Sequence, residues 1–279
     1  MVTAPHGSSR TGSVAAVEIA GSRALVTGAT GGLGQAIARA LARRGASLIL
    51  TGRRIEVLEP LAAETAGNAI GCDLADRADV DRLITEAGDV DILVANAGLP
   101  ASGRILSFDV GDLDRALDVN LRAPMVMARR LGEGMAERGS GHIVFVSSLA
   151  GKAASGGGSV YSATKFGLRG FAHGLREDLH PRGVGVSVVL PGFIRDAGMF
   201  AESGAKLPKG VGMKRPDDVA AAVVSAIERD RTEVDVAPLV LRAGVALAGL
   251  APGLSARVQR RVGGAKVADD MAEGQRAKR

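Results

Sequence analysis

The sequence predicts an α/β fold, a doubly wound parallel sheet of about seven strands with helices on both faces, in three α/β/α layers. Three observations predict it. Short apolar runs alternate with longer helical segments, as in repeated β-α-β units. A glycine-rich turn joins the first such strand to the first helix. Polar residues follow several strands, at the sheet edge where ligands of parallel sheets bind.

Composition limits the functions to consider. The chain has 279 residues, 46% of them apolar, which suffices for one large α/β domain or two small ones. Aromatic residues make up only 3%, with no Trp and one Tyr, which argues against stacking platforms for nucleic acid. The net charge is +5, but basic and acidic residues are interspersed, so we expect no nucleic-acid partner.

Cysteine and histidine usage predicts no metal site. The single cysteine, Cys72, excludes an intrachain disulfide and a multi-cysteine centre. The four histidines, His6, His142, His173 and His180, do not have metal-ligand spacing, and we expect surface or core roles for them. The first residues lack the features of a signal peptide, and no apolar run is long enough to span a membrane. We therefore expect a cytoplasmic protein.

The first strand is predicted over Arg23–Thr27 and the first helix over Gln35–Arg44. Between them stand three glycines in a G-x-x-x-G-x-G spacing, Gly28, Gly32 and Gly34. In such a turn, backbone N–H groups and the helix N-terminus bind a pyrophosphate, and the glycines allow its close approach. A turn of this kind also simply connects two elements, so phosphate binding is a hypothesis at this point.

The second strand, Ser47–Thr51, leads into a helix predicted over Ile55–Ala66. The strand is followed by Arg53 and Arg54, with no acidic residue to bind a ribose 2′-hydroxyl. An arginine here can bind a 2′-phosphate, so the sequence favours NADP(H) over NAD(H), with Arg53 as the preferred ligand. The alternative is a solvated helix start.

The next two strands also end in polar residues. Asn68–Cys72 is followed by Asp73 and a helix over Asp76–Gly88, and Asp91–Ala95 is followed by Asn96. Because the carboxyl ends of parallel strands share one edge, five candidates should meet there. They are Gly28, Arg53, Asp73, Asn96 and Ser148.

A long helix is predicted over Asp109–Glu137, interrupted by Asn120 and Pro124. We expect the Asn120 side chain to hydrogen-bond locally and bend the helix. A strand at His142–Val146 follows, then two serines, a loop of small residues, and a helix over Ser159–His180.

Tyr161 and Lys165 carry the predicted chemistry. They lie four residues apart on a helix, so their side chains share one face. A neighbouring ammonium group favours phenolate and should lower the pKa of the tyrosine, as general acid–base catalysis requires. A serine hydroxyl at the strand end, from Ser148 or its neighbour Ser147, is suited to hold a carbonyl oxygen. Alone, the pair also fits a packed aromatic residue and a solvated lysine.

The sixth strand, Gly183–Leu190, ends at Pro191. Residues 193–215 follow as a long aperiodic loop, rich in Gly and Lys, which we expect to form the substrate loop and a mobile lid. A helix over Asp217–Arg229 and a seventh strand at Glu233–Ala237 complete the fold.

The two ends of the chain lie outside the predicted domain of residues 21–238. Residues 1–20 are expected to be a flexible tail. Residues 239–262 are apolar first and basic later, which fits a helix packed on its own domain, a subunit contact or a helix on a membrane surface. Residues 263–279 are expected to be mobile.

Together these motifs resemble the short-chain dehydrogenase/reductase family over about residues 22–240, with its Rossmann-like fold. The matching positions are Thr27-Gly28, Gly32-x-Gly34, Asp73, Asn96-Ala97-Gly98, Asn120, Ser148, Tyr161-x-x-x-Lys165 and Pro191-Gly192. The 13 positions between Ser148 and Tyr161 are a spacing common in that family.

The resemblance implies a role for each catalytic candidate. Tyr161 is the general acid/base, and Lys165 lowers its pKa and binds the nicotinamide ribose. Ser148 orients the substrate oxygen beside Tyr161, and Asn120 positions a water in a proton relay toward Lys165. The resemblance also implies a small carbonyl or alcohol substrate and a homodimer or homotetramer.

The same resemblance implies the cofactor contacts, with NADP(H) the expected cofactor. They are Gly28, Thr30, Gly32, Leu33, Gly34, Arg53, Asp73, Leu74, Asn96, Ala97, Gly98, Tyr161, Lys165, Pro191, Gly192 and Ile194. One position departs from the pattern. Asp196 stands where the family usually has a cofactor-binding Thr, and its carboxylate would repel a pyrophosphate unless Arg195 or a water intervenes.

The main functional prediction is a hydride transfer between a nicotinamide cofactor and a carbonyl/alcohol pair. Two alternatives remain. A catalytically silent, cofactor-binding regulatory protein would keep the fold, although the four catalytic candidates argue against it. A nucleotide-sugar epimerase or dehydratase would use the same Tyr and Lys, but such enzymes are usually longer, with a larger C-terminal substrate lobe.

Overall fold

The computed structural model describes residues 17–205, 207, 212–251, 253, 257, 270 and 273–275. Its centre is a parallel sheet with the strand order β3-β2-β1-β4-β5-β6-β7. The strands are β1 (Arg23–Thr27), β2 (Ser47–Gly52), β3 (Asn68–Gly71), β4 (Ile92–Ala95), β5 (Gly141–Val146), β6 (Val184–Pro191) and β7 (Glu233–Val236). This is the predicted Rossmann-like fold, and the order confirms a doubly wound sheet.

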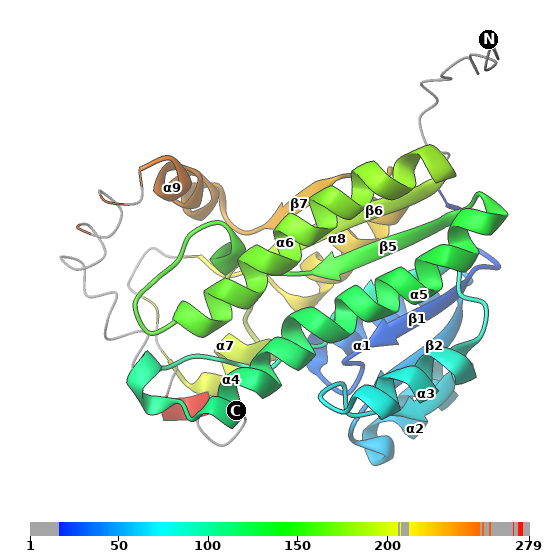
Figure 1. The fold of residues 1–279 in the computed structure, drawn as a ribbon, viewed down its shortest axis with the longest axis horizontal. Helices are drawn as coiled ribbons and strands as arrows, with labels where there is room; N and C mark the ends of the chain where they lie inside the picture. The colour runs from blue at the N-terminus through cyan, green and yellow to red at the C-terminus, as the bar shows by residue number, and fades with distance from the viewer. Residues whose placement is uncertain are drawn as a thin grey trace, which may run out of the picture.

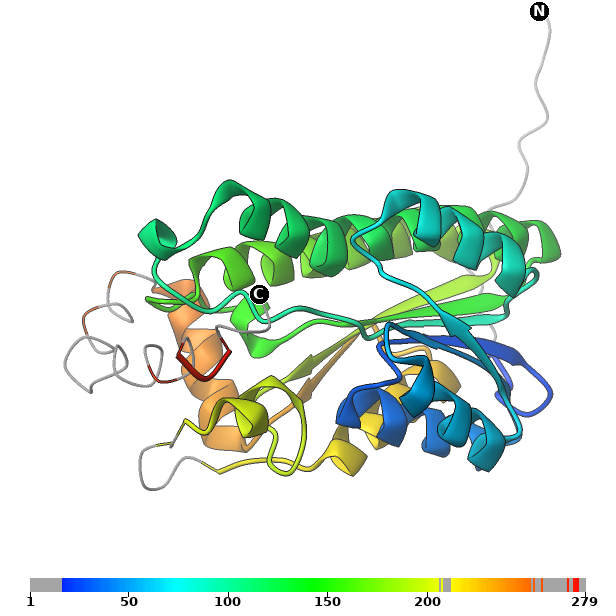
Figure 2. The same cartoon turned by 90° about the horizontal axis from the view of Figure 1, so that it is seen from below.

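Helices cover both faces of the sheet (Figure 2). They are α1 (Gly32–Ala42), α2 (Ile55–Thr65), α3 (Arg77–Ala87), α4 (Val110–Leu117), α5 (Ala123–Arg138), α6 (Ser159–Leu179), α7 (Gly198–Ser203), α8 (Pro216–Glu228) and α9 (Leu239–Leu250). One core lies between the sheet and α1, α2 and α8, and a second between the sheet and α3, α5 and α6. Because both faces are covered, the central strands are buried throughout rather than alternating, and their residues are apolar except for His142 and Ser187.

The chain reverses direction in the sheet between β1 and β4. From β1 it builds outward through β2 to β3, then crosses back to place β4 on the other side of β1, with Val26 opposite Val94. In doubly wound sheets, ligands bind beyond the carboxyl ends of the strands at such a reversal. The topology therefore places the candidate site at the end of the molecule where α4, α7 and α9 lie (Figure 1).

The predicted helix over Asp109–Glu137 is present with a different internal geometry. It consists of α4 and α5, joined by a π-helical turn at Asp118–Arg122. Pro124 does not interrupt the helix, because it occupies the first turn of α5, where its missing N–H costs no hydrogen bond. The interruption is the π turn, which holds Asn120.

Two other predictions need correction. Helix α1 begins at Gly32 rather than Gln35, so the glycine-rich turn includes the first turn of the helix. The predicted loop 193–215 contains the short helix α7 and a parallel bridge between Ile194 and Lys214. Residues 206 and 208–211 of this loop lie outside the described residues.

The C-terminal extension packs only in part on its own domain. In α9, Leu241 and Val245 contact the core beneath α3, α5 and α6, and the other residues of the helix are exposed or half-buried. The predicted tail over residues 1–20 lies outside the described residues up to residue 16, as does most of 263–279. No helix of the described part is long and apolar enough to cross a bilayer.

Candidate active site

A cavity of about 1270 Å³ opens at the carboxyl edge of the sheet. It is lined by every predicted site residue except Asn120, which is fully buried behind it. We call the part lined by α1 and the ends of β1–β4 the cofactor end, and the part lined by α7, α9 and residues 149–158 the substrate end. The five residues predicted to share the strand edge all line this cavity.

The glycines of the turn are required by close packing. Gly28 has a φ of +66°, and a Cβ there would lie 2.8 Å from the Cα of Ala97. A Cβ on Gly34 would lie 2.2 Å from the carbonyl oxygen of Gly28, so α1 can pack against the end of β1 only without a side chain there. The turn therefore exposes backbone groups and the N-terminus of α1 to the cavity, as phosphate binding requires.

The Asn96-Ala97-Gly98 motif joins β4 to β1. The Asn96 side chain donates to the carbonyl oxygen of Thr27 at 2.9 Å. The hydroxyl of Thr27 accepts from the backbone N–H groups of Asn96 and Ala97, both at 3.0 Å. This network fixes the two strand ends against each other, so the motif shapes the floor of the cofactor end.

The two arginines after β2 differ in their contacts. Arg54 donates from Nη2 to the carbonyl oxygen of Thr30 at 2.8 Å, which ties it to the glycine-rich turn. Arg53 is exposed, lines the cavity and lies near Asp73. Partial burial acts to raise the pKa of Asp73, but hydrogen bonds from Ala75 and Arg115 and the charge of Arg53 hold it below its usual range.

Tyr161 and Lys165 lie in the first turns of α6 and both line the cavity. The Lys165 Nζ is 5.6 Å from the centroid of the Tyr161 ring and donates to the carbonyl oxygen of Val146 at 3.1 Å. Ser147 is buried and donates to the carbonyl oxygen of Lys165 at 3.0 Å, which fixes α6 against the end of β5.

Burial changes the pKa of both groups. It raises the pKa of Tyr161 to about 12, although a hydrogen bond with Ser148 acts in the opposite direction. It lowers the pKa of Lys165 to about 8. The expected lowering of the tyrosine pKa is therefore not found in the protein by itself, because the loss of solvent contact dominates and the one opposing effect comes from Ser148. At neutral pH the tyrosine is a protonated donor and the lysine is largely cationic.

Ser148 lies between the strand ends and Tyr161. Its hydroxyl accepts from the N–H of Ala150 at 3.1 Å, donates to the carbonyl oxygen of Pro191 at 3.4 Å and hydrogen-bonds Tyr161. The hydroxyl is thus fixed from β5, β6 and α6 together, in a position to orient a substrate oxygen beside the phenol.

Asn120 has its partners across the fold rather than along its own helix. Its Oδ1 accepts from the N–H of Leu99 at 2.6 Å, and its Nδ2 donates to the carbonyl oxygen of Leu99 at 3.0 Å and to Thr164 at 3.3 Å. The expected local hydrogen bond is therefore wrong. The π turn points this amide inward, where it holds the chain after β4 close to Lys165.

The comparisons with known proteins agree with this geometry. The family model described as short chain dehydrogenase matches residues 22–208. The chain belongs to the short-chain dehydrogenase family. It is therefore an oxidoreductase that uses NAD(P)(H).

Relatives and solved structures cover most of this short-chain dehydrogenase. The ketoacyl reductase HetN of Nostoc sp. is 37% identical over 227 residues, covering 78% of this chain and 79% of its own. A short-chain dehydrogenase from Sphingobium yanoikuyae, solved with NADPH, is 28% identical with a TM-score of 0.74, over 84% of this chain and 94% of its own. A 3-ketoacyl-(acyl-carrier-protein) reductase from Brucella melitensis, solved with NADH, is 26% identical with a TM-score of 0.70, over 78% and 97%.

The cavity of this short-chain dehydrogenase fits a dinucleotide. The cofactor end offers the glycine turn, the first turn of α1 and a basic side chain at the end of β2. It also holds the buried hydroxyl of Thr51, which has no hydrogen-bond partner among the described residues. A polar atom left free at a cavity wall is available to a bound molecule.

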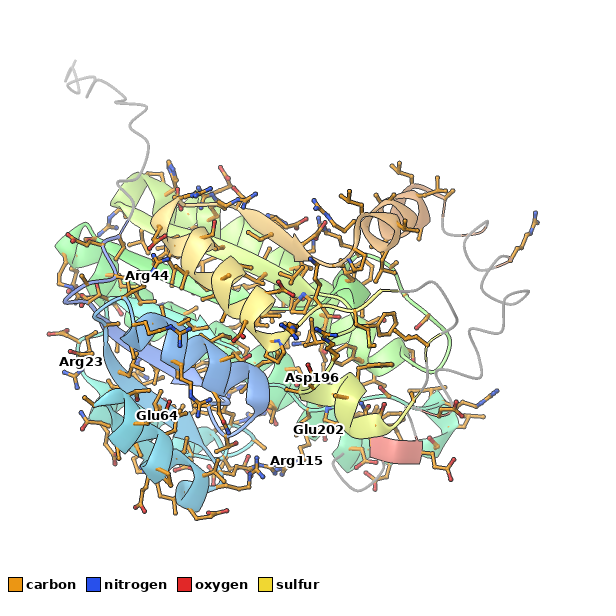
Figure 3. The ribbon with its side chains drawn as sticks, turned by 180° about the vertical axis from the view of Figure 1, so that it is seen from behind. Arg23, Arg44, Glu64, Arg115, Asp196 and Glu202 are labelled. Atoms are coloured by element: carbon orange, nitrogen blue, oxygen red, sulfur yellow. The ribbon has the colours of Figure 1, made fainter. Side chains whose placement is uncertain are left out.

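Asp196 is not among the residues that line the cavity of this short-chain dehydrogenase. Its side chain, labelled in Figure 3, lines a second hollow together with Arg39, Arg43 and Arg215. Its Oδ2 lies 3.5 Å from Nε of Arg195, the residue expected to intervene between this carboxylate and a pyrophosphate. The backbone at Asp196 has a φ of +69°.

Sequence reasoning predicted the loop 193–215 as the substrate loop but did not identify the individual side chains of the substrate end. Its walls are apolar and include Leu149, Phe193, Met199, Phe200, Leu241 and Val245. Gln275, near the C-terminus, is buried there and donates to the carbonyl oxygen of Met199 at 2.7 Å. No motif or period marks these positions. The expected substrate loop over residues 193–215 and the apolar first half of 239–262 indicated two of the segments, but not which of their side chains line the cavity.

No group of three or more His, Cys, Asp and Glu is arranged to hold a metal ion within the described residues. His142 lies in the core, where it is bonded to Ser187 at 2.8 Å, and burial lowers its pKa to about 4. His173 contacts Glu233 at 2.9 Å. His6 lies outside the described residues. Cys72 is buried directly after β3, and burial raises the pKa of its thiol to about 12.

Proposed function

We propose that this protein is an NADP(H)-preferring reductase of an apolar carbonyl substrate, with Tyr161 as the general acid. One observation carries the proposal. Tyr161 and Lys165 from α6 and Ser148 from the turn after β5 converge where the cofactor end meets the apolar substrate end. A bound nicotinamide supplies the hydride. The residues of the chain then need to orient one oxygen and deliver one proton.

The proton comes from Tyr161. With a pKa raised to about 12, the phenol is protonated at neutral pH and hydrogen-bonded to the serine that orients the substrate oxygen. As negative charge develops on that oxygen, the ammonium of Lys165 stabilises it and the phenolate that results. Asn120 supports this arrangement by holding Leu99 and the adjoining chain in place. These roles favour carbonyl reduction at neutral pH.

The cofactor preference rests on Arg53. It lines the cofactor end and is exposed, while Arg54 is bonded to the turn. A free guanidinium at the end of β2 is suited to a 2′-phosphate, which it can bind through two charge-assisted hydrogen bonds. The solved relatives were obtained with NADPH in one case and NADH in another, so the local residues carry this part of the proposal.

The substrate class follows from the apolar wall and the relatives. Aromatic and aliphatic side chains dominate the substrate end, so the carbonyl compound should carry an apolar chain or ring. Relatives of this chain are described as ketoacyl reductases, which act on a carbonyl of an acyl chain, and this chemistry fits the wall.

The decisive test is Tyr161→Phe. The ring is kept and only the proton donor is lost, so kcat with an apolar ketone should fall by about 10²–10⁴-fold. NADPH affinity, measured by fluorescence titration, should stay nearly unchanged. Phe166→Leu, on the exposed side of the same helix, is the matched control and should keep its activity. A Tyr161→Phe enzyme with near-wild-type kcat would refute the role. A wild type that binds NADPH but reduces no ketone would instead be a silent cofactor-binding protein.

A further inference from the structure

Helix α9 is apolar around most of its circumference. Leu241 and Val245 face the substrate end of the cavity. On its other sides, Leu239, Val240, Leu247 and Leu250 are 76, 84, 59 and 85% exposed. We call these four residues the α9 apolar face. One side of α9 therefore lines the cavity, and the other side exposes large apolar side chains to solvent. An exposed apolar patch of this kind marks a surface that binds a partner or a membrane.

The only charge within α9 anchors it to the domain. Arg242 Nε lies 3.7 Å from Oδ2 of Asp235 in β7, so the charge is directed toward the sheet. The apolar face is left without a charged residue to keep it in water. The ion pair between Arg242 and Asp235 therefore holds α9 with its apolar face toward solvent.

The sequence that follows α9 is basic. Residues 251–268 contain four basic residues, Arg257, Arg260, Arg261 and Lys266, and no acidic ones. Arg257 is exposed. A helix with a large apolar face beside basic residues is typical of segments that lie in the headgroup region of an anionic membrane.

A second exposed apolar group lies at the same end of the molecule. Ile105, Leu106 and Val110 precede or begin α4 and are exposed. In Figures 1 and 2, α4 and α9 both stand at the end toward which the carboxyl ends of the strands point. The end that holds the cavity is therefore also the end with the exposed apolar side chains.

We propose that the α9 apolar face seats the cavity on an anionic lipid surface, and that the carbonyl substrate is an apolar compound dissolved in that lipid. The substrate part rests on the proposed reductase function, whereas the lipid contact does not. The chain would lie on the surface rather than span it, since no described helix is long enough to do so. An apolar substrate then passes from the lipid past Leu241 and Val245 without crossing water.

Charge favours a lipid surface over a second copy of the chain as the occupant. A second copy of the chain would add like charge to the contact, because the sequence that follows α9 carries four basic and no acidic residues over 251–268. An anionic surface instead neutralises these charges.

Vesicle flotation tests the lipid contact with the full chain. Wild type should float with vesicles of phosphatidylcholine containing about a third phosphatidylglycerol, and the bound fraction should fall in high salt and with pure phosphatidylcholine. Val240→Glu/Leu247→Glu should reduce the partition coefficient about tenfold or more, because two large side chains leave the apolar phase. The control, Ala63→Glu/Thr85→Glu, adds the same charge on exposed positions of α2 and α3 and should float like wild type.

Two outcomes would overturn the lipid contact. One is a wild type that stays unbound with anionic vesicles. The other is a wild-type dimer that the α9 variant converts to monomer in light scattering without lipid, which would assign the face to a second copy. Circular dichroism confirms that the variants are folded.

An activity measurement separates the two parts of the proposal. With a long-chain ketone in vesicles, the α9 variant should show an apparent KM raised about tenfold, in line with its partition coefficient. With a short water-soluble ketone, its kcat/KM should match wild type. Equal loss on both ketones would contradict delivery from lipid. If neither protein reduces any ketone, the reductase function fails while flotation still decides the lipid contact.

Discussion

The cofactor end and the substrate end of the cavity are neighbours, but different interactions hold them. At the cofactor end, glycines pack against backbone at distances that exclude a single methyl group, and strand-end hydrogen bonds fix Asn96 to Thr27. At the substrate end, apolar side chains from two helices meet around open space, with a few hydrogen bonds such as that from Gln275 to Met199.

The difference separates the recognition of two kinds of molecule. The cofactor binds at the ends of the sheet strands, which are the least deformable part of the fold. The substrate binds to segments attached to the sheet, and their side chains can be replaced without disturbing the sheet. Changes at the cofactor end should therefore cost folding and all activity together, and changes at the substrate end should alter only substrate affinity.

The largest effect is expected from Gly34→Ala. The new Cβ would lie 2.2 Å from the carbonyl oxygen of Gly28, a backbone atom that cannot move without displacing β1. We expect a loss of about 1–3 kcal/mol in the free energy of unfolding and no measurable NADPH binding. Urea unfolding and cofactor titration measure both. Gly31→Ala is the control, because its Cβ would lie 3.5 Å from that oxygen, an ordinary contact. Equal behaviour of the two variants would contradict the packing argument.

Arg53→Ala tests whether Arg53 gives the cofactor end its preference for NADPH over NADH. Hydrogen bonds to a charged group contribute about 1.5–3 kcal/mol, so NADPH should bind about 10- to 150-fold more weakly while NADH is unaffected. Arg54→Ala should weaken both cofactors alike, since Arg54 supports the turn through Thr30. Side-by-side titration of both cofactors with both variants measures this. A wild type with equal affinities would mean that Arg53 is only a solvated helix start.

The pH dependence of kcat tests the role of Lys165, which lies where the cofactor end meets the substrate end. The pKa of Lys165 is lowered to about 8, so its ammonium is present below that pH and lost as pH rises through it. Reductive kcat should be flat below pH 8 and fall by about tenfold per unit above it, although Tyr161 remains protonated. Lys165 itself adds stability as pH rises through 8, because it binds fewer protons in the folded state than in the unfolded one, whereas the raised pKa of Cys72 removes stability above about pH 9. The temperature midpoint of unfolding should therefore not fall between pH 8 and 9. A profile flat up to pH 10 would contradict this role.

Leu241→Ala should give the smallest effect. The substitution removes the Leu241 side chain from the wall of the substrate end, so the substrate loses its contact with a few methylene groups. KM for an apolar soluble ketone should therefore rise about three- to tenfold. NADPH affinity should not change. Leu239→Ala, on the α9 apolar face, should leave both values as in wild type with that ketone. A change in NADPH affinity with Leu241→Ala would show that the two ends are not independent.

The same contrast explains what the sequence could predict. Strands, the glycine turn and the polar strand ends follow from local periodicity and from glycine, and they determine the cofactor end. The substrate end depends on where short segments pack. Helix α7 has six residues and no period, and Gln275 reaches Met199 from 76 positions away.

The chemistry shows the same limit. The spacing of Tyr161 and Lys165 was sufficient to predict a shared helix face. Their pKa values could not be predicted, because burial, the largest cause of both shifts, depends on the surrounding fold. Asn120 was identified as a break in a helix, but its partner, Leu99, lies 21 positions earlier, beyond any local pattern.

The π turn at Asp118–Arg122 has a consequence for insertions and deletions. A π turn contains one residue more than a regular helix uses over the same rise. Removing one residue there would let α4 and α5 join as a single regular helix, with better backbone hydrogen bonds than before. The same deletion would rotate Asn120 away from Leu99 by about 100°, the angle between successive residues of a helix. A shortened chain could thus be the better-folded one and still lose the amide that positions its active site.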